Sequence, residues 1–316
     1  MLDRALGKAW GSRNLSNSHR SLMLACLRQG TERPNAEEDM AELQSIVASC
    51  ETIIRLQNKT NAVQWLTDEG ASFPEAVYRY AFETAASMYN AEHTTGPHKG
   101  HYCQLPDDFS NSLVNFIKDS HSHIATLNYD GLLSSAFRNL NIFDCESAIL
   151  IDGFKESTFR RENLFREYEE TTSWYLHLHG CPLFSDDKSS SDIRKLSERS
   201  IRGDRRNNLR SVGRHIVLTH AKNKPAIIDN SLILRSYWEF LERALTESKE
   251  FLIFGYSGND PHLNRLIAQK RDDKRVRVVE WIGAGPEAER QDYWARQLGN
   301  SIELSLLENP LSFHDW

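Results

Sequence analysis

Hydrophobic and polar positions divide the chain into two parts. From residue 35 to residue 58 the apolar side chains recur at spacings of three and four, which is typical of one face of an amphipathic helix. Residues 74–89 and 107–117 also read as helices, and the polar stretch 91–105 between them is expected to form a loop. Residues 1–120 are therefore predicted to be mostly helical, either within one larger domain or as a helical subdomain.

The pattern changes at residue 123, where short apolar runs begin to alternate with helical stretches. This alternation, with short turns between the elements, predicts a parallel sheet flanked by helices. We expect residues 121–316 to form an α/β core of the Rossmann-like type. The predicted strands are 124–128, 174–179, 215–219, 251–256 and 276–282, and the predicted helices are 132–140, 232–245, 261–269 and 287–298.

One segment, residues 185–214, interrupts this alternation. It is rich in Ser, Asp, Lys and Arg and has few large apolar residues, so it is predicted to be a mobile loop. Its basic part, 202–214, holds five arginines and is interpreted as a solvated loop. The whole chain has 38 Lys and Arg against 44 Asp and Glu, a net charge of −6, which does not favour general nucleic-acid binding.

Other features of the composition narrow the class of protein. No apolar run approaches the roughly 20 residues that span a bilayer, and residues 1–12 hold no apolar segment typical of a signal peptide. We therefore expect a cytoplasmic protein without a membrane segment. The five cysteines form no CxxC pair, so neither a structural zinc site nor a disulfide framework is predicted.

Polar residues at the ends of the predicted strands are the candidates for function, because ligands of open α/β sheets bind beyond the carboxyl ends of the strands. Asn128 and Asp130 follow the first predicted strand. A carboxamide both donates and accepts hydrogen bonds, so Asn128 suits an amide, a hydroxyl or a water. The alternative is that both residues only form a turn and cap the next helix.

Two histidines occupy the second predicted strand. His177 and His179 fall on one face of it, and Gly180 follows directly. A neutral imidazole at the strand end can take a proton from a hydroxyl or a water. A structural role for His179 remains open, and metal binding by the pair would need a third ligand that the sequence does not reveal.

The third strand end is the stretch 255–263. Gly255 and Gly258 permit a sharp turn close to a ligand, and Ser257 offers a hydroxyl. Asp260, followed by a proline, is a strong helix start without any ligand, although contact with a ribose is also open to it. Glu280, near the end of the last predicted strand, is a weaker candidate for ribose hydroxyls, with a plain surface role as the alternative.

Taken in order, these motifs resemble the sirtuin-like family. Asn128 and Asp130 are similar to the family's NAD-pocket motif, and His179–Gly180 to its catalytic histidine. The stretch 255–263 resembles the family's serine-containing turn, in the version found in bacterial domains that serve in antiviral defence. The resemblance covers residues 124–282.

The resemblance implies a Rossmann-like fold and NAD as the ligand. Zinc-binding members carry paired cysteines and remove acyl groups from lysine, so the resemblance favours the zinc-free branch, whose members cleave NAD to nicotinamide and ADP-ribose. It implies Asn128 and His179 as catalytic residues. It implies Asp130, Gly255, Ser257, Gly258, Asp260 and Glu280 as NAD-binding residues.

One expected element is missing from the sequence. The family opens with a strand and a glycine-rich turn that holds the pyrophosphate, and Gly7 and Gly11 do not follow a strand pattern. Either this strand lies upstream of residue 1 or it has been lost. The alternative to an NAD hydrolase is therefore a non-catalytic NAD or ADP-ribose sensor or assembly module. A homo-oligomer or a partner protein of a defence system is expected in either case.

Overall fold

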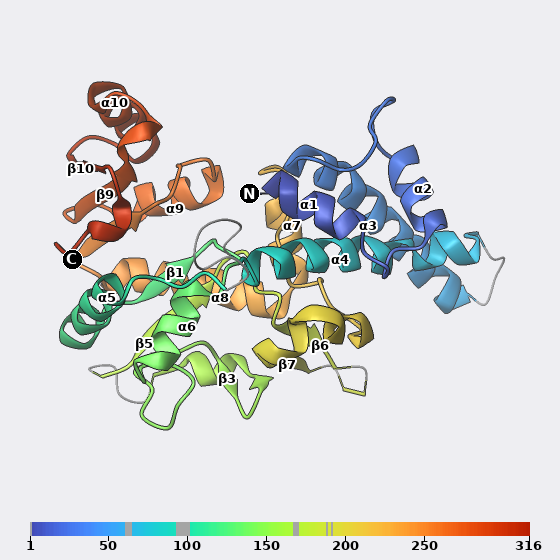
Figure 1. The fold of residues 1–316 in the computed structure, drawn as a ribbon, viewed down its shortest axis with the longest axis horizontal. Coiled ribbons are helices and arrows are strands. Elements are labelled where there is room, and N and C mark those ends of the chain that lie inside the picture. Colours follow the sequence, from blue (N-terminus) through green and yellow to red (C-terminus); the bar gives the residue numbers. More distant parts are fainter. Residues whose placement is uncertain (1, 61–64, 93–101, 167–170, 188, 191) are drawn as a thin grey trace.

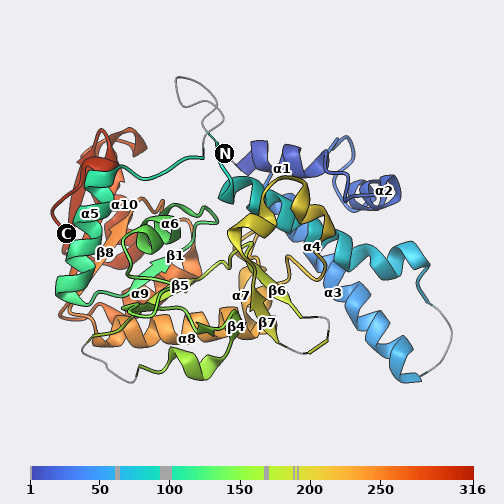
Figure 2. The same ribbon diagram turned by 60° about the horizontal axis from the view of Figure 1, so that its bottom comes forward.

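The computed structural model confirms an α/β fold in which parallel sheets are flanked by helices and the first part of the chain is helical. In Figures 1 and 2 the first four helices lie on one side of the molecule and the C-terminal strands on the opposite side. The structure describes residues 2–60, 65–92, 102–166, 171–187, 189–190 and 192–316.

The helical part is built around α4, which buries one long face against its neighbours. Thr67 starts this helix by accepting a hydrogen bond from the amide of Gly70 at 3.2 Å. Val77, Tyr80 and Phe82 are fully buried along it. The four helices are α1 (Leu2–Trp10), α2 (Asn17–Ala25), α3 (Glu37–Thr60) and α4 (Asp68–Tyr89).

Within the described residues, six strands form two parallel sheets of three strands each. The first sheet has the order β1–β5–β2, with Thr126 opposite His177. The second has the order β10–β9–β8. Of these strands, β2 and β10 are not among the predicted ones. The bounds are β1 (Ile124–Thr126), β2 (Leu150–Ile151), β5 (Ser173–His177), β8 (Glu250–Phe254), β9 (Arg275–Trp281) and β10 (Ile302–Leu307).

Helices cover the parallel strands and supply most of the apolar contacts. The longest of them, α8, begins at Ser231, whose hydroxyl accepts from the amide of Leu234, and it packs on β5. The indole of Trp238 on α8 donates to the carbonyl oxygen of Leu178 at 3.0 Å. The covering helices are α5 (Asp107–Ser120), α6 (Leu132–Asn139), α7 (Lys224–Asn230), α8 (Leu232–Glu247), α9 (Pro261–Lys270) and α10 (Glu287–Leu298).

The predicted loop 185–214 contains regular structure. Two of its strands belong to a four-stranded antiparallel sheet of order β3–β4–β7–β6. Two 3₁₀ helices follow, and Arg206 reaches Glu83 of α4 at 2.9 Å. The elements are β3 (Phe154–Lys155), β4 (Thr158–Phe159), β6 (Phe184–Asp186) and β7 (Ile193–Lys195), with 3₁₀ helices at Arg161–Leu164, Glu198–Ile201, Gly203–Asn208, Ile282–Ala284 and Pro310–Ser312.

The predicted strand at 215–219 is wrong. Ile216, Val217 and Leu218 are buried, but they make a single isolated bridge, between Ile216 and Gly180, and the amide of Val217 bonds to the carbonyl oxygen of His179 at 2.9 Å. An apolar run predicts that a segment is buried. Residues 215–219 are buried, but they do not form the repeated hydrogen bonds of a strand.

Gly180 permits this segment to lie directly against the end of β5. Its φ is +81°, and a Cβ atom there would lie 1.6 Å from the carbonyl oxygen of His215. A side chain at this position is therefore excluded both by the backbone conformation and by the neighbouring chain.

Replacement of this glycine tests that close approach. We expect Gly180→Ala to lower the free energy of unfolding by about 2–4 kcal/mol, measured by urea unfolding, since the segment must move away. The control is Gly203→Ala, where φ is +56° and open space surrounds the site, with an expected loss of about 1 kcal/mol. Equal losses in the two variants would contradict the packing argument.

Candidate functional site

The carboxyl ends of β1 and β5 bring Asn128 and His179 to the same edge of one sheet. The two strands are parallel neighbours, and the amide of Leu178 extends the pairing by donating to the carbonyl oxygen of Thr126 at 2.9 Å. Asn128 and His179 each follow two residues after their strand ends. The order of the strands therefore places both candidates at one rim, as ligand binding in α/β sheets requires.

Asn128 is exposed, whereas one carboxylate oxygen of Asp130 bonds to the backbone. The amide of Asn128 donates to the hydroxyl of Thr126 at 3.1 Å, which fixes the turn and leaves the carboxamide toward solvent. Asp130 accepts from the amide of Leu132 at 3.1 Å at the start of α6. Burial raises the pKa of the Asp130 carboxyl group. The helix-starting role of Asp130 is thus present in the structure.

His179 is buried, with 7% of its surface exposed. Its Nε2 lies 3.1 Å from Oδ2 of Asp260, and its ring lies 6.4 Å from that of Tyr129, centroid to centroid. Burial lowers the pKa of His179, and its hydrogen bond to the Asp260 carboxylate offsets this only in part. The imidazole is therefore neutral near pH 7. Because a carboxylate only accepts, we assign the proton to Nε2, and Nδ1 is then the basic nitrogen.

Asp260 connects this histidine with two other parts of the chain. Its Oδ1 accepts from the amides of His262 and Leu263 at 3.0 and 3.2 Å, which caps α9. Its Oδ2 contacts both His179 and the ammonium group of Lys224, each at 3.1 Å. Burial raises the pKa of Asp260, but these partners outweigh it and hold that pKa well below its usual range. Asp260 is ionised and saturated with donors.

Lys224 is a site residue that the sequence analysis missed. It is only 6% exposed and lies at the first position of α7. In the sequence it stands in the polar stretch Lys222–Asn223–Lys224–Pro225, where the proline indicates a helix start but nothing distinguishes a buried lysine from a surface one.

The turn after β8 carries Gly255, Ser257 and Gly258, and Asp260 at its end contacts His179. Both glycines have positive φ, +62° and +79°, and the amide of Gly255 donates to Val279 on β9 at 2.9 Å. Ser257 is exposed, and its carbonyl oxygen accepts from the hydroxyl of Tyr293 at 3.1 Å. The Ser257 hydroxyl is thus presented outward on a turn that only glycines readily form.

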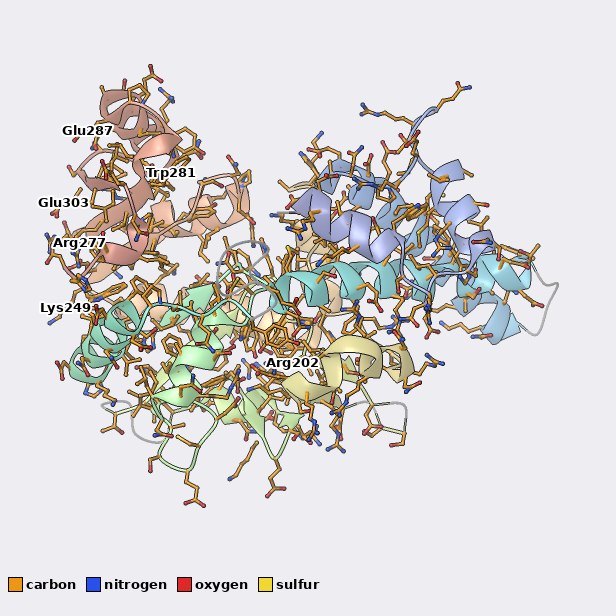
Figure 3. The ribbon with its side chains drawn as sticks, viewed as in Figure 1. Arg202, Lys249, Arg277, Trp281, Glu287 and Glu303 are labelled. Atoms are coloured by element: carbon orange, nitrogen blue, oxygen red, sulfur yellow. The ribbon has the colours of Figure 1, made fainter. Side chains whose placement is uncertain are left out.

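Glu280 is not a plain surface residue. It is 4% exposed and forms a two-pronged ion pair with Arg290 of α10, at 2.6 and 2.9 Å. The next residue, Trp281, is 58% exposed and is labelled in Figure 3 together with Arg277 and Glu303 of the same sheet. Glu280 therefore lies at the strand end as predicted, but its carboxylate already has a cationic partner.

His177 belongs to the packed interior. Its ring lies 4.6 Å from that of Tyr175 and 5.7 Å from that of Phe184, centroid to centroid. Its Nδ1 is buried without a hydrogen-bond partner, and burial lowers its pKa to about 3. Across the described residues, no three His, Cys, Asp or Glu side chains gather as a metal-binding group. His177 and His179 thus have different surroundings, and of the two only His179 contacts an acid.

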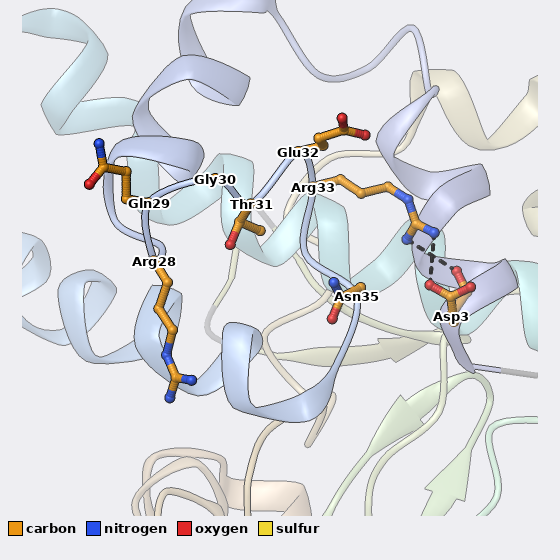
Figure 4. A pocket seen from close by; sticks show the side chains of 8 residues that line it. All are labelled: Asp3, Arg28, Gln29, Gly30, Thr31, Glu32, Arg33 and Asn35. Carbon is orange, nitrogen blue, oxygen red and sulfur yellow. Dashed lines mark hydrogen bonds and ion pairs between the residues drawn. The ribbon is translucent and has the colours of Figure 1, made fainter.

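Two cavities lie away from these residues. One, of about 780 Å³, opens between the start of α1 and the loop before α3 and is lined by Asp3, Arg28, Arg33 and Asn35, among others (Figure 4). The other, of about 450 Å³, is lined by Phe165, Arg243 and Lys270, among others. Neither includes Asn128 or His179, so neither adds a residue to the candidate site.

A comparison with protein families matches residues 122–302 to the family described as SIR2-like domain. The match covers more than half of the chain. The chain belongs to the SIR2-like domain family. No curated protein matches the chain in sequence.

The matched range of the SIR2-like domain contains every candidate residue from Asn128 to Glu280, and also Lys224. It begins after α5, so the helices of residues 1–120 lie outside it. A SIR2-like domain implies a function related to NAD. Of the helices in the described part of the chain, none has the length and apolar character needed to cross a membrane.

The buried His177 gives the SIR2-like domain a measurable dependence on pH. An unfolded histidine has a pKa of about 6.5, whereas His177 in the folded chain has a pKa of about 3. Between these values only the unfolded chain binds the proton. The free energy of unfolding should therefore fall by about 1.4 kcal/mol for each unit that the pH decreases, as the contribution of this one residue.

We expect His177→Leu to remove this contribution, so that the slope of stability against pH becomes less steep. Urea unfolding at several values between pH 4 and pH 7 measures the slope. His314→Leu, at an exposed position, serves as the control and should leave the slope unchanged. An identical slope in the wild type and His177→Leu would show that His177 is not buried in its neutral form.

Proposed function

We propose that this SIR2-like domain cleaves NAD at the bond between nicotinamide and ribose, releasing nicotinamide and ADP-ribose. The observation that carries the proposal is the pairing of His179 with the ionised Asp260 at the rim where Asn128 is exposed. The imidazole is neutral and its Nε2 is held by a carboxylate. A histidine in this state is suited to accept a proton at Nδ1.

The residues of the rim suit the parts of a dinucleotide. The exposed carboxamide of Asn128 can hold a ribose hydroxyl or a water. The turn with Gly255, Ser257 and Gly258 offers the hydroxyl of the exposed Ser257 at the end of β8. In the proposal these groups bind the ribose and phosphates, Asp130 orients the nicotinamide amide, and Glu280 lies toward the adenosine ribose.

The chemical step breaks one bond and forms another. The glycosidic C–N bond breaks, and its electron pair leaves with nicotinamide, which departs as a neutral molecule. An oxocarbenium-like centre forms at the ribose carbon, as in glycoside cleavage. A water positioned by Asn128 attacks this carbon, and its proton passes to Nδ1 of His179. No strong general acid is required because the leaving group is already neutral.

In this scheme Asp260 does not contact a ribose but holds His179 in position. Its carboxylate contacts His179, Lys224 and the first turn of α9, and the residue is 3% exposed. We assign it to holding the histidine. His179 is itself 7% exposed, so substrate reaches it only after a covering residue moves. Control of activity by assembly or by a partner of a defence system is consistent with this closed state.

The proposal predicts loss of NAD cleavage in two variants. We expect His179→Ala and Asn128→Ala each to lower kcat/KM by about 100-fold or more, measured as nicotinamide released by the purified chain. His314→Ala and Asn139→Ala, both at exposed positions, are the matched controls and should retain wild-type rates. Full activity in both site variants would refute the assignment.

A non-catalytic sensor of NAD or ADP-ribose is the second candidate function. The burial of His179 favours it, because a buried imidazole requires a conformational change when NAD binds. Such a change can signal to a partner without any catalysis. Calorimetry distinguishes the two. Tight NAD binding without release of nicotinamide supports the sensor, and turnover supports the hydrolase. A chain that neither binds nor cleaves NAD would exclude both.

A further inference from the structure

Lys224 is buried in the protein interior, where a charged ammonium group lowers the stability of the fold unless it is paired. It is 6% exposed, and an ammonium group taken out of water loses several kcal/mol unless it is paired. Among the described residues, Asp260 is the carboxylate at ion-pair distance from it, with 3.1 Å between Nζ and Oδ2. The residue therefore needs an explanation beyond a surface helix start.

The contact of Lys224 is with the same oxygen that meets the histidine. Oδ2 of Asp260 receives both Nζ of Lys224 and Nε2 of His179, while Oδ1 is held by two backbone amides of α9. Four donors thus surround one carboxylate. The carboxylate cannot rotate without losing several of them, so its direction toward His179 is fixed.

The charges of His179, Asp260 and Lys224 indicate how the lysine affects the histidine. A histidine paired with a carboxylate alone is drawn toward its protonated form. A nearby ammonium group opposes that protonation, because a second positive charge would then be buried beside the first. With Lys224 present the trio consists of a neutral imidazole, a carboxylate and an ammonium group, and its net charge is zero.

We propose that Lys224 is a positioning residue that fixes the Asp260 carboxylate against Nε2 of His179 and keeps the imidazole uncharged. Its role in turnover rests on the proposed NAD cleavage, whereas its effect on the histidine does not. The electrostatics agree with this geometry, since the charge of Lys224 lowers the pKa values of both His179 and Asp260.

The segment that carries Lys224 is anchored to the helical part of the chain. The amide of His220 donates to the carbonyl oxygen of Glu37 at 3.1 Å, and the side chain of Asn223 donates to that of Ala41 at 3.1 Å. The first turns of α3 therefore fix the position of α7 and its lysine. Other titratable groups near the trio, within the described residues, include Tyr129 after β1, Glu37 on α3 and Tyr256 after β8, and His220 before α7 lies near Glu37.

The test compares Lys224→Met with Lys224→Arg, which keeps the charge. The titration of His179 is followed by NMR without NAD, and His179→Ala identifies its signal. We expect Lys224→Met to raise the pKa of His179 by about one unit and Lys224→Arg to leave it near the wild-type value. Lys222→Met, two residues away and exposed, is the matched control. Thermal unfolding establishes that each variant is folded.

The same variants are then assayed for NAD cleavage across pH. In Lys224→Met the acid limb of the plot of rate against pH should move to higher pH by the same amount as the His179 pKa. In Lys224→Arg it should lie near the wild-type position. An unchanged His179 titration in folded Lys224→Met would overturn the inference, even if activity fell. A wild type without NAD cleavage but with the expected NMR shift would refute the proposed function and leave the role of Lys224 intact.

Discussion

A buried carboxylate can remain ionised only if donors replace the water that it has lost. Asp260 meets this condition with four of them, drawn from the end of β5, the start of α7 and the first turn of α9. The position of the candidate base, the capping of a helix and the docking of another all depend on this one side chain. Removing its charge would leave a lysine buried and unpaired, which is among the more costly defects in a protein interior.

The helical part and the α/β part are joined by the same kind of interaction. Glu83 on α4 is 1% exposed and pairs with Arg206 at 2.9 Å, and it also accepts from the side chain of Asn14 at 2.7 Å. Tyr89 at the end of α4 donates to Glu198 at 2.6 Å. The basic segment after β7 is thus held against α4 by paired charges. This explains why a stretch with so few large apolar residues contains regular structure.

The sequence was sufficient to predict the elements that position the site. The apolar runs that became β1, β5, β8 and β9 each had the length and flanking turns of a buried strand, and the parallel order of β1 and β5 places Asn128 and His179 at one rim. The run at 215–219 is also apolar, but it packs against Gly180 and covers the end of β5. An apolar run indicates that a segment is buried, so it cannot distinguish a strand from a buried segment that packs over a strand end.

The hydrogen-bond and ion-pair partners of the site residues are harder to predict from the sequence than their positions at the strand ends. The sequence predicts Asp260 as a helix cap, and it is one, but its second oxygen contacts His179, which lies 81 residues earlier in the chain. Lys224 gave no signal because its burial depends on segments that meet only in the folded chain. Glu280 was placed at the correct strand end, while its pairing with Arg290 follows from the docking of α10. Charge pairing over long separations depends on tertiary structure that composition does not contain.

For the proposed cleavage of NAD, the neutrality of the His179 trio matters because the substrate carries a positive charge. The nicotinamide ring of NAD is cationic, and the oxocarbenium-like centre that forms during cleavage is cationic as well. An imidazolium at the rim would repel both and could not accept the proton of the attacking water. Because the charge of Lys224 is compensated by Asp260 at 3.1 Å, it opposes protonation of the histidine without adding a net positive charge to the site. In the proposed reaction the ion pair would therefore keep His179 able to accept a proton and would not repel the cationic substrate.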